Sequence, residues 1–161
     1  MLVHFPVALF TVYALLEIAS LTRLGKQAYW FYVKAVVVLF GSVASCAAAT
    51  AGVLIKPLFS GEPTIERLVT THETFAITTV VVFVLIAFGY AVAWIRKDMP
   101  AIRLPGFVNG VSVFLQRTVV RMVLAGIGLA CVTITGALGG AIAYSPTVDP
   151  AVSLIYRIFI R

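Results

Sequence analysis

The stretch Leu68-Val-Thr-Thr-His-Glu-Thr-Phe75 opens an apolar run that decides the fold class of this chain. No charged residue occurs among the 22 residues from Thr74 to Ile95. As an α-helix rising about 1.5 Å per residue, this run is about 33 Å long, enough to cross a hydrocarbon core of about 30 Å. It therefore predicts a transmembrane helix. His72, one of two histidines in the chain, stands at the mouth of that helix.

The composition of the whole chain is that of an integral membrane protein. Of its 161 residues, 61% are hydrophobic and 11% are charged, whereas soluble domains carry about 25% charged residues. We expect a single transmembrane domain over residues 1–161, with spans at about 4–21, 30–55, 72–95 and 122–144. The predicted fold is an all-α membrane protein, a four-helix transmembrane bundle, because short loops favour antiparallel neighbours.

Two segments outside the spans are predicted to lie in the membrane interface. Asp149-Pro150 has the pattern of a helix N-cap followed by proline at the first helical position. The residues after it, 151–161, are too few to span, so they predict a short C-terminal amphipathic helix in the interface. The loop after the third span, up to about Leu115, is expected to include a second short apolar segment of this kind.

The distribution of lysine and arginine predicts the orientation in the membrane. The side that holds the first and third loops carries Arg23, Lys26, Lys34, Arg96, Lys97, Arg103, Arg117 and Arg121, and the opposite side carries Lys56, Arg67, Arg157 and Arg161. By the positive-inside rule the first group is cytoplasmic, so both termini face outward from the inner (cytoplasmic) membrane. Topology thus explains the basic charge, which gives no support to nucleic-acid binding.

The two histidines form a candidate metal site. Spans one and three cross the membrane in the same direction, so His4 and His72 are expected near the same, outer face. Helices one and three are diagonal in an up-down bundle, and two imidazoles facing each other there would ligate one haem b iron axially. The alternative is that each histidine is an interfacial residue, hydrogen-bonded near the lipid headgroups.

Other residues fit a haem at this place. Small residues on spans two and four would leave room for a flat ring: Gly41, Ser45, Ala49, Gly126, Gly128, Gly136 and Gly140. Four outer cations would neutralise the propionates: Lys56, Arg67, Arg157 and Arg161. The predicted cofactor site is therefore His4 and His72 as metal ligands, with Arg67 beside them.

Glu17 is the only acid well inside a predicted span. Intramembrane acids are functional candidates by default, but Glu17 lies near the cytoplasmic end, and we expect it to pair with Lys34 or Arg121. Glu73 is expected to be a surface carboxylate, because it points about 100° away from His72 on the helix. The chain has no HExxH, GxSxG, phosphate-loop or CxxC motif, so nothing supports a hydrolase, a kinase or a thiol oxidoreductase.

The opening Met1-Leu-Val-His-Phe-Pro-Val-Ala-Leu-Phe10 resembles that of the DUF2231 family of small bacterial membrane proteins, whose signature reads roughly His-Pro-x-x-Val-His-Phe-Pro-Ile-Ala-Leu. Thr50-Ala-Gly52, His72 and the stretch 136–144 agree with that family in order. The resemblance implies a four-span bundle, and it implies electron transfer, since relatives are joined to Rieske-type iron–sulfur or cytochrome c domains. The family's upstream His-Pro is absent, and Ser145-Pro146 stands where a histidine often follows.

Two functions from different classes follow from these patterns. The first is a b-type haem protein that passes electrons near the outer face within a larger redox complex. The alternative is a non-catalytic accessory subunit of a respiratory, photosynthetic or transport assembly. With either function, we expect the protein to have no enzyme activity of its own. In both cases we expect it to contact lipid and either other membrane subunits or a redox partner on the outer side. A channel or transporter is least favoured, because no broken span or buried charge pair marks a pathway.

Overall fold

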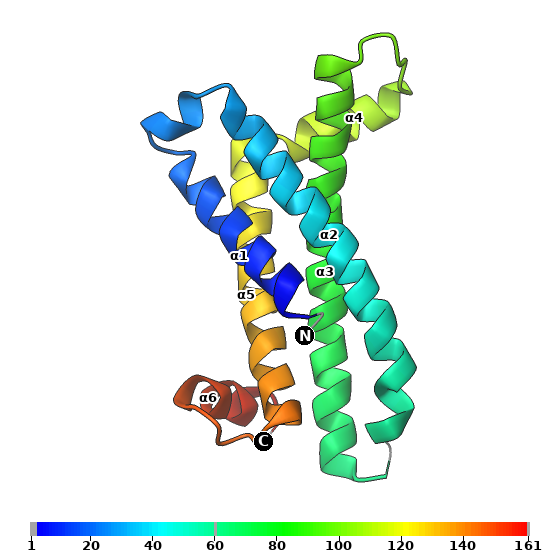
Figure 1. Ribbon diagram of the computed structural model, residues 1–161, viewed down its shortest axis with the longest axis vertical. Helices are drawn as coiled ribbons and strands as arrows, with labels where there is room; N and C mark the ends of the chain where they lie inside the picture. Colours follow the sequence, from blue (N-terminus) through cyan, green and yellow to red (C-terminus); the bar gives the residue numbers. More distant parts are fainter. Residues whose placement is uncertain (1–2, 60, 161) are drawn as a thin grey trace.

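The computed structural model describes residues 3–59 and 61–160, which form helices joined by short loops. The bundle consists of α1 (His4–Ala19), α2 (Tyr29–Ile55), α3 (Pro63–Asp98) and α5 (Thr118–Ala143). The shorter helices α4 (Gly106–Leu115) and α6 (Pro150–Phe159) lie at opposite ends, and the 3₁₀ helices η1 (Arg23–Lys26) and η2 (Lys56–Phe59) lie in the first two loops (Figure 1). The all-α bundle predicted from the sequence is confirmed.

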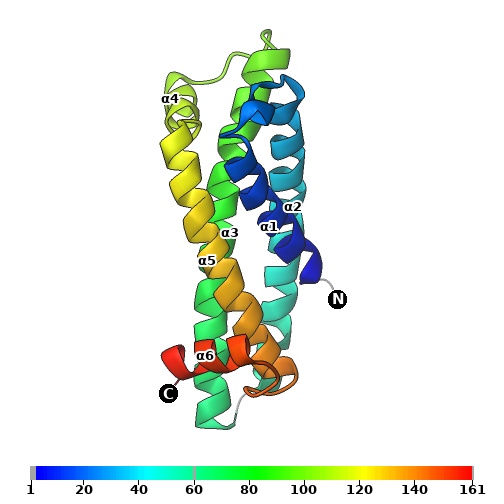
Figure 2. The same cartoon turned by 90° about the vertical axis from the view of Figure 1, so that its left-hand side faces the viewer.

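The four bundle helices form a ring in which each helix has two neighbours. Helix α1 packs against α2 and α5, and α3 packs against the same two helices. Helices α1 and α3 are therefore diagonal, as the up-down topology predicts. Figures 1 and 2 show the resulting elongated bundle, with α6 lying across the end of α5.

Helix α1 is short compared with the membrane. Its 16 residues make about 24 Å of helix, less than the roughly 30 Å of a hydrocarbon core. Within the described ranges, three helices are long and apolar enough to cross a membrane, namely α2, α3 and α5. Figure 1 shows that α1 begins partway along the bundle, whereas α3 begins at its lower end. Beyond the first turn of α1, no residue of α1 covers α2 and α3, and a cavity lies beside that turn.

Helix α3 is the longest element, with 36 residues. Pro63 occupies its first turn, where the missing N–H is not needed. Several threonines on this helix donate their hydroxyl hydrogens to carbonyl oxygens one turn earlier: Thr71, Thr74, Thr78 and Thr79. These bonds satisfy polar groups for which lipid offers no partner, so the helix can be both threonine-rich and membrane-spanning.

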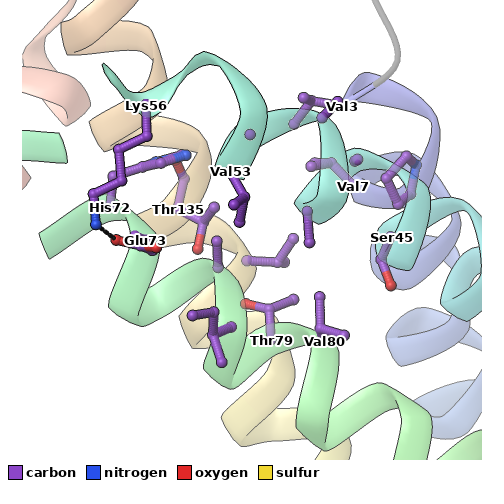
Figure 3. Close-up of a pocket in the computed structure, with 18 of the residues that line it drawn as sticks. Val3, Val7, Ser45, Val53, Lys56, His72, Glu73, Thr79, Val80 and Thr135 are labelled. Atoms are coloured by element: carbon purple, nitrogen blue, oxygen red, sulfur yellow. Dashed lines mark hydrogen bonds and ion pairs between the residues drawn. The ribbon is translucent and has the colours of Figure 1, made fainter. Parts of the chain in front are cut away.

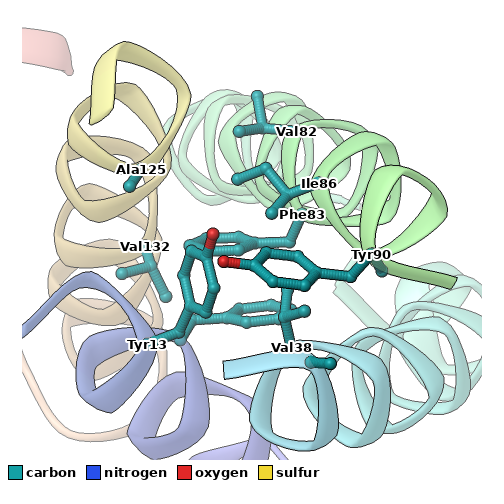
Figure 4. Packing of buried hydrophobic residues seen from close by; sticks show 11 residues of the cluster. Tyr13, Val38, Val82, Phe83, Ile86, Tyr90, Ala125 and Val132 are labelled. Carbon is teal, nitrogen blue, oxygen red and sulfur yellow. The ribbon is translucent and has the colours of Figure 1, made fainter. Parts of the chain in front are cut away.

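Aromatic rings in the bundle core pack directly against glycines of neighbouring helices. Phe10 of α1 and Phe83 of α3 stack with a centroid separation of 3.7 Å and an interplanar angle of 3°. A Cβ at Gly41 would lie 2.8 Å from the Phe10 ring, and one at Gly128 would lie 2.7 Å from the Phe83 ring. Figure 4 shows Phe83 between Tyr13, Tyr90 and the surrounding helices. Two of the glycines that the sequence offers as room for a cofactor are thus filled by the protein's own rings.

The remaining glycines of that set have other roles. A Cβ at Gly140 would lie 3.5 Å from Val152 of α6, so this glycine lets α6 pack on α5. Gly126 and Gly136 are exposed, and a Cβ at either would meet nothing within 4 Å. None of the four α5 glycines is among the residues that line the cavity, so they do not widen it.

We expect Gly128→Val to destabilise the bundle by about 1–3 kcal/mol, because the added methyl groups displace the Phe83 ring and overpack the core. Gly126→Val is the matched control, since it makes the same backbone change on the same helix with no neighbour nearby. Thermal denaturation in detergent, followed by circular dichroism, measures both. Equal melting temperatures for the two variants would contradict the packing at Gly128.

Helices α4 and α6 have the character of interfacial helices. Helix α4 buries Ser112 and Leu115 and leaves Phe107 and Phe114 exposed. In α6, the Asp149 side chain accepts a hydrogen bond of 2.9 Å from the Val152 N–H, and Pro150 follows it. The predicted N-cap is confirmed, and so is the short C-terminal helix.

Candidate functional site

An apolar cavity of about 300 Å³ opens beside the first turn of α1. Val3 and Val7 line one side of it, Ala48 and Ala49 of α2 another, and Val80 of α3 a third. Figure 3 shows these walls converging on a space between the helices. The volume lies at the lower end of the range for small-molecule sites, about 300–1,000 Å³.

The open side of the cavity faces the surroundings of the bundle. Two of its lining residues, Val53 and Ile77, are 61% and 52% exposed. In a bilayer this surface contacts acyl chains, because it belongs to the membrane-spanning parts of α2 and α3. An apolar ligand would therefore enter from the lipid phase.

His72 lies on the wall of this cavity, half-buried against α5. Its Nδ1 is 3.0 Å from the Thr135 carbonyl oxygen. A carbonyl oxygen only accepts hydrogen bonds, so Nδ1 carries the proton and the neutral ring keeps a lone pair on Nε2. Gly139 makes room for the ring, because a Cβ there would lie 3.2 Å from His72 Cε1. This arrangement is how proteins orient a metal-binding imidazole.

Lys56 and Glu73 form an ion pair at the mouth of the cavity, beside His72 (Figure 3). Their side chains are 46% and 29% exposed. Glu73 was expected to be a surface carboxylate, but it is only partly exposed, is paired with Lys56, and lines the same cavity as His72. Lys56 is the cation among the four propionate candidates that lines the cavity.

The structure does not bring the other predicted site residues into the cavity. Val3, Pro6 and Val7 of the first α1 turns line it, whereas His4 is exposed and points about 100° away from Val3. Arg67 is exposed on the first turns of α3, and Arg157 is exposed on α6. Arg161 lies outside the described residues. Of the predicted metal ligands, His72 alone is therefore placed on the cavity wall.

A second polar site lies deeper in the bundle, centred on Glu17, which is fully buried. Its carboxylate is 3.1 Å from Lys34 Nζ and 3.3 Å from Arg121 Nε. The hydroxyls of Tyr13 and Tyr90 donate to its Oε1 at 2.7 and 2.8 Å. The pairing expected from the sequence is confirmed, with both candidate cations bound to the same carboxylate.

In this cluster, side chains from all four bundle helices meet at the Glu17 carboxylate. Tyr13 and Glu17 come from α1, Lys34 from α2, Tyr90 from α3 and Arg121 from α5. Two cations and one carboxylate leave one excess positive charge in the bundle. A buried ion cluster is therefore present, and the expectation that placed a channel or transporter last for want of a buried charge pair is wrong.

The sequence contained a signal for one of the two tyrosines. Tyr13 and Glu17 are four residues apart, so a helix places them on the same face. Tyr90 is 73 residues from Glu17, and no local pattern connects them. Only the packing of α3 across from α1 reveals that Tyr90 completes the site.

These features define a class: a small helical membrane bundle with a lipid-facing apolar cavity on one side and a buried ion cluster on the other. Residues 1–150 match the family described as "Predicted membrane protein (DUF2231)". The chain therefore belongs to the DUF2231 family. No curated protein and no solved structure matches it.

Proposed function

We propose that this protein is a membrane-embedded electron-transfer protein that binds a b-type haem at the cavity through His72, as part of a larger redox complex. The observation that carries the proposal is the His72 imidazole, fixed through Nδ1 by the Thr135 carbonyl with its Nε2 lone pair left for a metal. When bound, haem iron supplies one-electron redox chemistry.

The residues around His72 suit such a group. The walls are apolar and would exclude water, and Lys56 at the mouth would pair with a propionate. The cavity is small for a macrocycle, so the open side at Val53 and Ile77 would have to accommodate part of it. His4 is the proposed second ligand, and it would require the first turn of α1 to rotate.

The test is the visible spectrum of the purified full chain. Protein made in cells supplied with haem precursors should show a dithionite-reducible b-type spectrum at one haem per chain. Titration of haem-free protein with haem b should saturate at the same ratio. The absence of both the spectrum and saturable binding would rule out the haem function.

Gly139→Ala should weaken haem binding by about tenfold, because the new methyl group pushes His72 away from the carbonyl that orients it. A Cβ at this position would stand 3.2 Å from the imidazole, whereas one at Gly136 has open space. Gly136→Ala is therefore the matched control on the same helix. Haem titration of the two proteins compares their dissociation constants, and equal values would show that the His72 position does not matter.

The accessory-subunit function is favoured by a different observation on α5. Four small residues at helical spacing are exposed on its outer face: Gly126, Ala130, Thr133 and Gly136. In membranes such a face lets another helix approach closely. If the chain serves mainly to pack against larger subunits, Ala130→Leu should release it from a complex seen by native electrophoresis of membranes, without changing any haem content.

We further propose that the protein resides in the inner (cytoplasmic) membrane with both termini outside. The excess of lysine and arginine in the loops next to η1 and α4 supports this orientation. A cysteine at Gln27, an exposed loop position, should react with a membrane-impermeant maleimide after cells are opened and not before. Labelling in intact cells would show that the orientation is the opposite of the one proposed. The native cysteines Cys46 and Cys131 are replaced by alanine for this experiment.

A further inference from the structure

One buried hydroxyl on the cavity wall has no hydrogen-bond partner among the described residues. Thr135 is 6% exposed and lines the cavity, and its Oγ1 is left unpaired. The other two hydroxyls of the lining are bonded within their own helices, since Ser45 donates to the Ser42 carbonyl and Thr79 donates to the Phe75 carbonyl. A buried hydroxyl without a partner is unfavourable, above all at membrane depth, so Thr135 points to a ligand.

A second unused polar atom lies on the same wall. The His72 ring donates from Nδ1 to the Thr135 carbonyl, so its Nε2 accepts hydrogen bonds. Figure 3 shows the His72 and Thr135 side chains at the same end of the cavity. A single hydroxyl group of a ligand satisfies both atoms, because it donates its hydrogen to Nε2 while its oxygen accepts from Thr135 Oγ1.

A further hydrogen-bond acceptor lies at the cavity mouth. Glu73 lines the cavity and pairs with Lys56, and a carboxylate has about four lone-pair positions, so this pair leaves room for a ligand hydroxyl. Elsewhere the walls are mainly apolar, and a dry apolar cavity of about 150 Å³ is large enough to hold benzene. The volume of about 300 Å³ found here therefore suits a substituted six-membered ring that carries hydroxyls at opposite ends.

We propose that the haem-free chain binds a lipid hydroquinone in this cavity, with one ring hydroxyl at His72 Nε2 and Thr135 Oγ1 and the other at the Glu73 carboxylate. The apolar tail of such a molecule passes through the open side, beside Val53 and Ile77, into the acyl chains. The imidazole Nε2 and the carboxylate both require a ligand that donates hydrogen. The hydroquinone therefore binds more tightly than the quinone, whose carbonyl oxygens only accept. Binding leaves the oxidation state of the ligand unchanged.

This site does not depend on the proposed haem function. A hydroquinone hydroxyl and a haem iron would use the same Nε2 lone pair, so each ligand excludes the other. The Thr135 hydroxyl has no part in haem ligation, whereas the Thr135 carbonyl orients His72 for either ligand. A substitution that removes only this hydroxyl therefore separates hydroquinone binding from haem binding.

The test is an anaerobic calorimetric titration of the purified, haem-free full chain in detergent with duroquinol (tetramethylhydroquinone) and with its oxidised form, duroquinone. Micelles without protein give the blank for partition of the ligand. We expect duroquinol to saturate at one molecule per chain and to bind about tenfold more tightly than duroquinone, because the quinone leaves both acceptors without a donor. No saturable duroquinol binding, or equal affinity for the two forms, would overturn the proposal.

Matched threonine variants assign the site. Thr135→Val replaces the hydroxyl by a methyl group and keeps the carbonyl, so duroquinol binding should weaken about tenfold while haem titration stays unchanged. Thr133→Val makes the same change at an exposed position of α5, where the hydroxyl donates to the Leu129 carbonyl, and it should bind duroquinol as the parent does. Equal duroquinol affinities of the two variants would contradict the proposal. If Thr135→Val does not fold, the preference of the parent for the reduced form decides.

Discussion

Replacing Glu17 by alanine is expected to destabilise the bundle by about 3–5 kcal/mol, which is the usual cost of removing one partner from a buried ion pair. The alanine leaves Lys34, 5% exposed, and the mostly buried Arg121 without a counter-charge. It also leaves the hydroxyls of Tyr13 and Tyr90 without their acceptor. Native proteins are stable by only about 5–15 kcal/mol, so the loss is a large share of the total stability.

Glu73→Ala is the control for this prediction. Glu73 also pairs with a lysine, Lys56, but both side chains are partly exposed, and such pairs contribute about 0–1 kcal/mol. Denaturation of the two variants in mixed micelles gives the comparison. A second variant, Glu17→Leu with Lys34→Met, should recover part of the loss, because it removes one buried charge together with its partner. Similar midpoints for Glu17→Ala and Glu73→Ala would show that the cluster does not hold the helices together.

Replacing His72 by alanine is expected to abolish haem retention. The imidazole is the one neutral nitrogen ligand that the described residues place on the cavity wall. Lys56 is held in its ion pair with Glu73, and the remaining walls are apolar apart from hydroxyls. An apolar helix offers no substitute ligand for iron. The measurement is the reduced-minus-oxidised spectrum of the purified variant, with the haem content expressed per chain.

His4→Ala is the matched control for His72→Ala, because it removes the same side chain from the exposed start of α1. We expect it to weaken haem binding less, since a ligand at a helix end can be replaced by water. Circular dichroism checks that both variants are folded. Wild-type haem content in both variants would show that neither histidine is a ligand, and the accessory-subunit function would then be favoured.

Much of the architecture was predictable because it follows from local patterns. Uncharged runs such as 74–95 are long enough to span the membrane, and α3 contains this whole run. Asp149-Pro150 specified the start of α6 through a side-chain cap that needs only neighbouring residues. The end of the first span was predicted less accurately. The predicted span extended to about residue 21, whereas α1 ends at Ala19.

The site was predictable only in part. The sequence singled out His72 by its position at the mouth of a span, and the structure places it on a cavity wall. The α5 glycines were assigned to a cofactor, although Gly128 accommodates Phe83 and Gly140 accommodates Val152. A glycine creates space, and the sequence does not say which side chain fills it.

By itself, the sequence determined that this chain is a helical membrane bundle, where its helices run, and that Glu17 needs a cation. These properties depend on hydrophobicity and on helical spacing, which act between residues close together in the chain. Tertiary structure alone decided that Thr135 orients His72 and that Tyr90 shares Glu17 with Tyr13. Those contacts join residues 63 and 73 positions apart, and they depend on the rotation and depth of each helix against its neighbours, which no local pattern encodes.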